Sequence, residues 1–171
     1  MEYIFFCGVH GVGKTTLLRK LANEKPIFST SVSDLIRSAG ENIEDTNKLT
    51  KNASKNQDLW KQELTKISVN KGFKLALDGH FCLLDSKGKL ILLPDDTFDG
   101  TNMKKIVLKK ENPVVIKQRI ETRDGTKWDL KKIKLFQQAE EDRALFYSRK
   151  NSIPLFIFDN DNRYGELLEF I

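Results

Sequence analysis

The sequence predicts an α/β protein with a five-stranded parallel sheet, helices on both faces and a small β-hairpin after the third strand. Short apolar runs alternate with segments of helical periodicity along the chain. A glycine-rich stretch, residues 8–15 (GVHGVGKT), separates the first apolar run from the first helical segment. A carboxylate, Asp78, ends a later apolar run. Because ligands bind at the carboxyl ends of strands in such sheets, these features predict a site at that edge.

Five apolar runs predict the strands of the sheet, at residues 3–7, 26–29, 73–77, 105–109 and 154–158. Helices are expected over residues 15–21, 33–40, 57–67, 113–123, 129–149 and 164–171. Ser33, Asn112 and Asp129 are the predicted N-caps, since their side chains can accept a hydrogen bond from the first helical turn. Trp60, in the helix that begins near residue 57, is expected in the core beside the site.

Three further segments have weaker patterns. Residues 41–56 are polar and predict either a helix with a solvated face or a mobile excursion. Residues 81–93 contain two apolar runs joined by 85–88 (DSKG), which predicts a hairpin at the rim of the site. Residues 94–102 carry Asp95, Asp96 and Asp99, and their spacing is not that of a calcium loop, so a solvated loop is expected.

Composition predicts one globular domain spanning residues 1–171, either monomeric or dimeric. Hydrophobic residues make up 39% and charged residues 31% of the chain, as in ordinary soluble proteins. The net charge of +5 is compatible with nucleic-acid binding, but scattered lysines favour a solvated surface. Cys7 and Cys82 lack metal-ligand spacing, which predicts buried free thiols in a cytoplasmic setting. No apolar segment is long enough to span a membrane, so no membrane partner is expected.

The stretch GVHGVGKT has the pattern of a phosphate-binding P-loop. Glycines let several backbone N–H groups point into one concavity, and the helix that follows adds its positive dipole end. Lys14 supplies a cation for the outer phosphates, and the Thr15 hydroxyl can ligate Mg²⁺. ATP and Mg²⁺ are therefore the expected cofactors. The predicted nucleotide-binding residues of the loop are Gly8, His10, Gly11, Val12, Gly13, Lys14, Thr15 and Thr16.

Asp78-Gly79-His80 follows the third predicted strand. A carboxylate at this position near a P-loop can hold Mg²⁺ through water or orient an attacking group. Asp-Gly is also a common turn dipeptide, so an ordinary turn is the alternative. His80 lies two residues beyond Asp78, which in an extended chain places both side chains on one side. The pair is therefore a candidate for metal binding by Asp78 and substrate binding by His80.

A short lid is predicted at about residues 122–130. Arg119 and Arg123 are four residues apart on one helix, and residues 124–127 break that helix. Arginines beside a hinged loop suit a phosphoryl-transfer lid, because planar donors can close over phosphates and exclude water. The alternative is a solvated helix face. After the last strand, the polar loop that contains Asn160 is expected to contact the purine base with backbone groups.

These motifs together resemble the small P-loop nucleoside monophosphate kinases of the adenylate kinase type. Residues 29–37 (STSVSDLIR) are similar to the Ser-Thr-Gly-Asp-Leu-Leu-Arg acceptor segment of that family, with Asp34 and Arg37 on its Asp and Arg. The family glycine is missing and one residue is inserted. Asp78-Gly79-His80 is similar to the Asp-x-His of archaeal-type and nuclear adenylate kinases, and a second acceptor arginine has no counterpart.

The resemblance implies a role for each matched residue. Arg119 is expected over the adenine, and Arg123 on the transferred phosphoryl group. The expected activity is transfer of the ATP γ-phosphoryl group to a small acceptor, with a nucleoside monophosphate favoured. Two alternatives remain. One is a kinase for a nucleoside, a small alcohol or a polynucleotide end, which would require Asp34 or His80 as a base. The other is an ATPase or nucleotide switch that acts on a protein or RNA partner.

Overall fold

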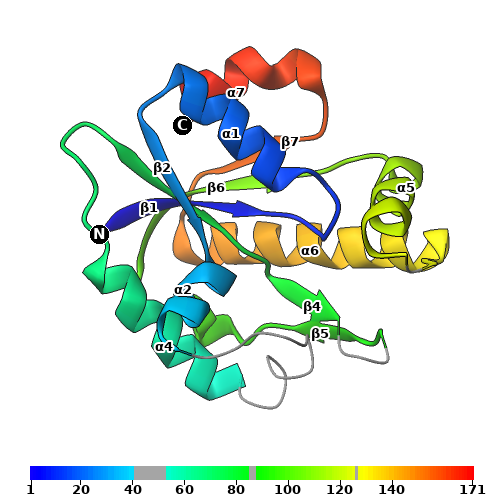
Figure 1. Cartoon of the computed structure of the whole chain (residues 1–171), viewed down its shortest axis with the longest axis horizontal. Coiled ribbons are helices and arrows are strands. Elements are labelled where there is room, and N and C mark those ends of the chain that lie inside the picture. The colour runs from blue at the N-terminus through cyan, green and yellow to red at the C-terminus, as the bar shows by residue number, and fades with distance from the viewer. Residues whose placement is uncertain (41–52, 85–87, 126) are drawn as a thin grey trace.

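A five-stranded parallel sheet with strand order β2–β3–β1–β6–β7 forms the centre of the computed structural model (Figure 1). The structure describes residues 1–40, 53–84, 88–125 and 127–171, with the side chains of residues 53–57 and 124 left out. The sheet strands are β1 (Glu2–Cys7), β2 (Ile27–Ser31), β3 (Lys74–Asp78), β6 (Asn102–Lys109) and β7 (Leu155–Phe158). A separate antiparallel hairpin pairs β4 (Cys82–Leu84) with β5 (Leu90–Leu92). The predicted fold class is confirmed.

Helices follow the strands in the predicted order. Their bounds are α1 (Lys14–Glu24), α2 (Val32–Ser38), α4 (Ala53–Lys66), α5 (Pro113–Asp124), α6 (Leu130–Asn151) and α7 (Tyr164–Phe170), with short 3₁₀ turns at η1 (Asp95–Phe98) and η2 (Asp161–Arg163). Asn112 caps α5 through a bond from Val114 N, and Asp129 caps α6 through one from Lys131 N. Both predicted caps are therefore confirmed.

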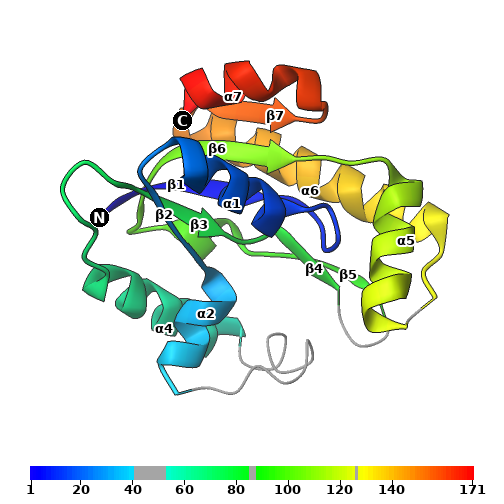
Figure 2. The same ribbon diagram turned by 45° about the horizontal axis from the view of Figure 1, so that its top comes forward.

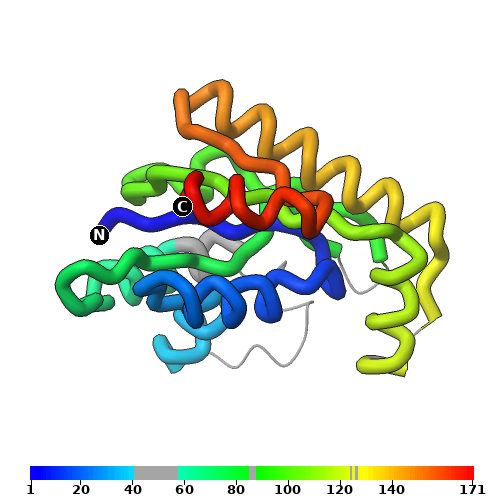
Figure 3. The backbone as a smooth tube through the Cα atoms, turned by 90° about the horizontal axis from the view of Figure 1, so that it is seen from above, coloured from blue at the N-terminus to red at the C-terminus, as the bar shows by residue number. Residues whose placement is uncertain are grey.

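Alternating side chains of β1 divide the core into two layers. Ile4 and Phe6 pack against α1 and α7 on one face of the sheet. Tyr3, Phe5 and Cys7 face the other layer, which α2, α4, α5 and α6 complete. Seen from above, α1 lies on one side of the strands and α6 on the other (Figure 3). Because the central strands are covered on both faces, they are continuous apolar runs.

Two predicted boundaries are wrong because strand pairing extends beyond the apolar runs. β2 continues to Ser31, which pairs with Asp78, so the N-cap of α2 is Ser31 and not Ser33. β6 begins at Asn102 and not Lys105, because its first residues pair with β1. The acidic segment is also not simply a solvated loop. It forms η1, where Phe98 is buried, and Asp95 pairs with Arg143 and Lys150 of α6.

Some predictions fall on residues outside the description. These are the structure of residues 41–52, the turn at 85–87 of the hairpin and the middle of the predicted lid at residue 126. Within the described residues, Cys7 and Cys82 are buried free thiols, as predicted. None of the described helices is long and apolar enough to cross a membrane.

Candidate active site

A cleft of about 880 Å³ opens at the carboxyl ends of β1, β2 and β3. Helices α1, α2 and α5 contribute residues to its lining and follow β1, β2 and β6 at this edge of the sheet (Figure 2). Most of the predicted site residues meet there, although they come from four separate parts of the chain. The predicted residues that line the cleft are His10, Gly11, Val12, Gly13, Lys14, Thr15, Thr16, Asp34, Arg37, Asp78, His80, Arg119 and Arg123.

The P-loop begins at Gly8, where the backbone passes close to β6. A Cβ atom built on Gly8 would lie 2.4 Å from the carbonyl oxygen of Lys109, and the residue has a φ of +140°. Only glycine fits such a position without a shift of the backbone. The Gly8 N–H donates to Glu140, and its carbonyl accepts from Lys14. Gly8 therefore anchors the loop and is not among the residues that line the cleft.

Lys14 and Asp78 form the centre of the site. Lys14 Nζ donates to the Gly8 carbonyl at 2.5 Å and lies 3.5 Å from Asp78 Oδ1, with only 7% of the lysine exposed. Burial raises the pKa of the Asp78 carboxyl, and the adjacent Lys14 ammonium partly offsets this effect. Parallel pairing of β1 with β3 places Asp78 opposite Phe6. Because the P-loop follows β1 directly, Asp78 lies close to Lys14. A cation and a carboxylate thus stand together at the start of the helix dipole of α1.

Thr15 and Asp78 provide a hydroxyl and a carboxylate within the same cleft. Magnesium prefers oxygen ligands and keeps several waters, so it is usually bound by one or two protein groups plus phosphate oxygens. In the described parts of the chain, no group of three or more His, Cys, Asp or Glu side chains could hold a metal. The donor set therefore fits a magnesium ion that binds together with the nucleotide phosphates.

Two histidines stack beside this centre. The rings of His10 and His80 have centroids 4.3 Å apart and an interplanar angle of 41°. Burial lowers the pKa of His80 well below its ordinary value, and Lys14 and His10 lower it further. The His80 Nδ1 atom is buried and has no hydrogen-bond partner among the described residues. A neutral imidazole next to Lys14 adds no positive charge of its own to the site.

Asp34 and Arg37 of α2 also line the cleft. Their side chains form a direct ion pair, and Ser31 Oγ donates to Asp34 Oδ2 at 2.6 Å. Burial is the largest single influence on Asp34 and opposes its ionisation, but the hydrogen bonds with Ser31 and Arg37 and the charge of Arg37 together outweigh it and lower the pKa. Both side chains are more than half exposed, so the pair is open to a ligand.

Arg119 and Arg123 reach the cleft from α5. Arg119 Nη1 donates to the Val12 carbonyl at 3.2 Å, and Nη2 lies 3.3 Å from a carboxylate oxygen of Glu111. The hydrogen bond to Val12 fixes Arg119 against the P-loop. Arg123 is one helical turn further along the same helix, near the start of the predicted lid. The two arginines therefore line the cleft from α5, whereas Arg37 lines it from α2.

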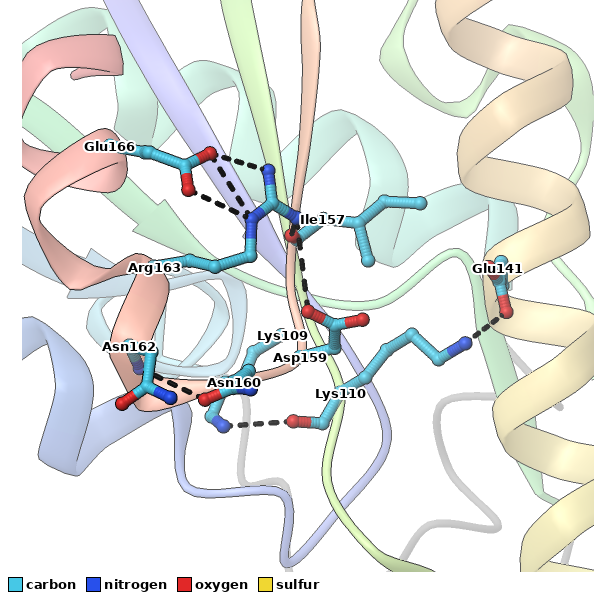
Figure 4. Close-up of polar contacts among 9 residues, drawn as sticks. All are labelled: Lys109, Lys110, Glu141, Ile157, Asp159, Asn160, Asn162, Arg163 and Glu166. Carbon is cyan, nitrogen blue, oxygen red and sulfur yellow. Dashed lines mark hydrogen bonds and ion pairs between the residues drawn. The ribbon is translucent and has the colours of Figure 1, made fainter.

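Asn160 lies in the loop after β7 and is not among the residues that line the cleft. Its Oδ1 accepts from Asn162 N at 2.9 Å and so caps η2 (Figure 4). Nearby, Arg163 is held by Asp159 and Glu166. The contact of Asn160 with a purine base stays a prediction, and the structure shows that its side chain has a local structural role.

Sequence reasoning missed one central residue, Glu140, which accepts hydrogen bonds from three backbone N–H groups around the site. The signal was present, because Glu140 falls on the same helical stripe as the apolar Phe136 and Ala144. Apolar walls of the cleft were only partly foreseen. As predicted, the hairpin lies at the rim, through Leu83 and Leu93, and Trp60 is buried. Val32, Ile36 and Phe98 add to this wall.

Comparison with known proteins agrees with this geometry. A family described as the AAA domain matches residues 7–134, which include the P-loop, Asp78 and both arginines of α5. The chain belongs to the AAA domain family. No curated protein sequence matches it significantly. The whole chain shares its fold with the crystal structure of shikimate kinase from Bacteroides thetaiotaomicron, with a TM-score of 0.58 and 19% identity over 98% of each chain. At that identity the likeness shows the fold, which is that of a P-loop kinase.

Proposed function

We propose that the protein is an ATP-dependent phosphotransferase that moves the γ-phosphoryl group of Mg-ATP to a nucleoside monophosphate. The observation that supports this proposal most directly is the continuity of the cleft. A single cavity is lined both by Lys14 of the P-loop and by Arg37 of α2. A donor phosphate and an acceptor phosphate can therefore bind in one cleft, as transfer between them requires.

In the donor half, the loop N–H groups and Lys14 hold the β- and γ-phosphates. Thr15 and Asp78 would hold Mg²⁺, directly and through water, and the ion would neutralise part of the phosphate charge. Arg119 and Arg123 add planar donors from α5, where positive charge stabilises the oxygens of the transferred group. The chain itself needs to form no covalent bond, because positioning and electrostatics supply the catalysis.

In the acceptor half, the Arg37 guanidinium is the donor for the acceptor phosphate. The state of the candidate bases also favours a phosphate acceptor. A hydroxyl acceptor requires a base whose pKa lies near the working pH. The pKa of Asp34 is lowered by its hydrogen bonds, and His80 Nδ1 is buried. A monophosphate is already an anion and needs neither base.

A non-nucleotide small molecule is the second candidate acceptor, because the fold is shared with a shikimate kinase. A nucleoside or a polynucleotide end is another candidate kinase acceptor, and hydrolysis coupled to a protein or RNA partner is the remaining alternative. The apolar wall of Trp60, Phe98 and Leu83 suits the flat body of a base more than a small polyol. These alternatives differ in what stimulates the release of ADP.

The test is a coupled assay of ADP release from Mg-ATP with nucleoside mono- and diphosphates, nucleosides, small alcohols and RNA, beside an acceptor-free control. We expect strong stimulation by one monophosphate. Arg37→Ala should raise the KM for that acceptor at least tenfold, because a charge-assisted hydrogen bond is lost. Arg149→Ala is the matched control, since this exposed arginine does not line the cleft. Equal rates with and without every acceptor would exclude the kinase.

A further inference from the structure

Glu140 is a fully buried carboxylate in the middle of α6, with 0% of its surface exposed. Its Oε1 atom accepts from Gly8 N at 3.1 Å and from Phe81 N at 2.9 Å. Its Oε2 atom accepts from Phe81 N at 3.0 Å and from Cys82 N at 2.7 Å. A single side chain thus collects three N–H groups from two segments that are far apart in the sequence.

Each of these two segments adjoins residues that line the candidate active site. Gly8 is the first residue of the P-loop, and its carbonyl accepts the ammonium of Lys14. Phe81 directly follows Asp78-Gly79-His80, the turn that provides the second half of the Lys14–Asp78 pair. Glu140 does not line the cleft itself. Its carboxylate therefore joins the peptide that begins the donor loop to the peptide that ends the Asp78 turn.

An acid is an unexpected choice for this position. Phe136 and Ala144, one helical turn before and after Glu140, are buried and apolar. Removing a charge from water is costly, and an apolar side chain of similar volume is often as stable or more stable. An ionised carboxylate, however, is a pure acceptor and can bond all three N–H groups at once. A glutamine has one acceptor oxygen, and its NH₂ group would point at a backbone donor.

We propose that Glu140 is a positioning residue, which fixes the P-loop and the Asp78–His80 turn relative to each other and so keeps Lys14 beside Asp78. It acts through Gly8 and Phe81 and does not contact the substrates. Its loss is expected to disturb the alignment of the catalytic groups more than the binding of nucleotide, because the other loop N–H groups remain. Misplacement of catalytic groups by a small distance can slow a reaction strongly.

The experiment compares Glu140→Gln with Glu141→Gln, an identical change at the next residue of the same helix. Glu141 pairs with Lys110 at 2.6 Å near the loops that follow β6 and β7 (Figure 4). Neither Glu141 nor Lys110 is among the residues that line the cleft. We expect Glu140→Gln to lower kcat at least tenfold, with the Kd of a non-hydrolysable Mg-ATP analogue changed less than threefold. A crystal structure of this variant should show Lys14 Nζ displaced from Asp78. Glu141→Gln should match the wild type in all three measurements.

Glu140→Asp keeps the charge with a shorter reach and guards against a variant that fails to fold. It should retain more turnover per folded molecule than Glu140→Gln. Equal turnover per folded molecule in Glu140→Gln and Glu141→Gln would overturn the proposal, as would a fall in nucleotide affinity as large as the fall in kcat. Because the inference rests on the proposed function, analogue binding and the Lys14–Asp78 separation are measured without an acceptor. They test Glu140 even if no acceptor stimulates the enzyme.

Discussion

Arg123 lines the cleft from the last turn of α5, one helical turn beyond the Arg119 that rests on the P-loop. Arginines that stabilise the transferred phosphoryl group contribute about 10³-fold or more to turnover. We predict that Arg123→Ala lowers kcat by a comparable factor and changes ATP affinity only modestly, because the phosphates are held mainly by the loop. Steady-state kinetics with the acceptor found in the screen provide the measurement. Lys117→Ala, on the same helix, is the control, and a near-wild-type kcat for Arg123→Ala would remove Arg123 from the mechanism.

Gly79 lies between the two polar residues of the Asp78 turn and touches the core. A Cβ atom at this position would lie 2.6 Å from a ring carbon of Phe5, which is completely buried. We predict that Gly79→Ala lowers the free energy of unfolding by about 1–3 kcal/mol, as other overpacking substitutions do. Urea denaturation measures the difference. Gly165→Ala is the control, since no atom of the described residues lies within 4 Å of its added Cβ and alanine favours the helix. Equal stability of the two variants would contradict the prediction.

His80 makes the stability of the protein depend on pH. Its folded pKa is lowered well below the ordinary 6.5, chiefly by burial, so the unfolded chain binds the proton more readily. The stability is therefore complete above pH 6.5 and is lost as the pH falls toward the folded pKa. We predict that the wild type loses up to about 1.4 kcal/mol per pH unit in this window relative to His80→Gln. Unfolding free energies between pH 8 and 5 test this, and parallel pH profiles of the two proteins would refute it.

At the level of the element, the entry into α2 depends on the serine that ends β2. Ser31 Oγ accepts from Asp34 N at 3.0 Å and so caps the helix that presents Asp34 and Arg37. We predict that Ser31→Ala costs about 0.5–2 kcal/mol of stability, the usual loss for a serine cap. Ser33→Ala should cost less, although local sequence favours that residue as the cap. Thermal denaturation of both variants decides between them, and a larger loss for Ser33→Ala would reverse the assignment.

Elements defined by local signals could be predicted from the sequence. The apolar runs of β1 and β3 and the caps Asn112 and Asp129 depend only on neighbouring residues. The end of β2 could not be predicted, because Ser31 is extended by its pairing with Asp78 in another strand. The same holds for the first residues of β6, which pair with β1. Strand ends are set by partners that a local pattern does not contain.

The candidate site shows the same division. Lys14 and Thr15 follow from a motif with fixed spacing, and the structure places both at the cleft. Glu140 was missed because its role depends on three N–H groups brought together only by the fold. A charged residue on an otherwise apolar helical stripe was its only trace in the sequence. Such an exception is informative, because an unpaired buried charge would be strongly destabilising.

At the scale of the whole molecule, residues from both layers of the core line the cleft. Leu18 of α1 belongs to the layer that α7 covers, and Trp60 belongs to the layer on the other face of the sheet. The P-loop begins directly at the end of β1, which pairs with β3 on one side and β6 on the other. A ligand that binds between these elements favours the folded state of the whole domain, since small domains unfold cooperatively.

We therefore predict that a non-hydrolysable Mg-ATP analogue at 100 times its Kd stabilises the protein by about 2.7 kcal/mol. For a domain of this size that corresponds to a rise in Tm of roughly 5–10 °C, with a single transition retained. Differential scanning calorimetry measures both the shift and its cooperativity. Lys14→Ala should lose most of the shift at the same analogue concentration, because the cation that contacts the outer phosphates is gone. Removal of Mg²⁺ by a chelator should reduce the shift in the wild type, since the phosphate charge is then less neutralised. An equal shift in the wild type and Lys14→Ala would mean that the nucleotide binds elsewhere than at the P-loop.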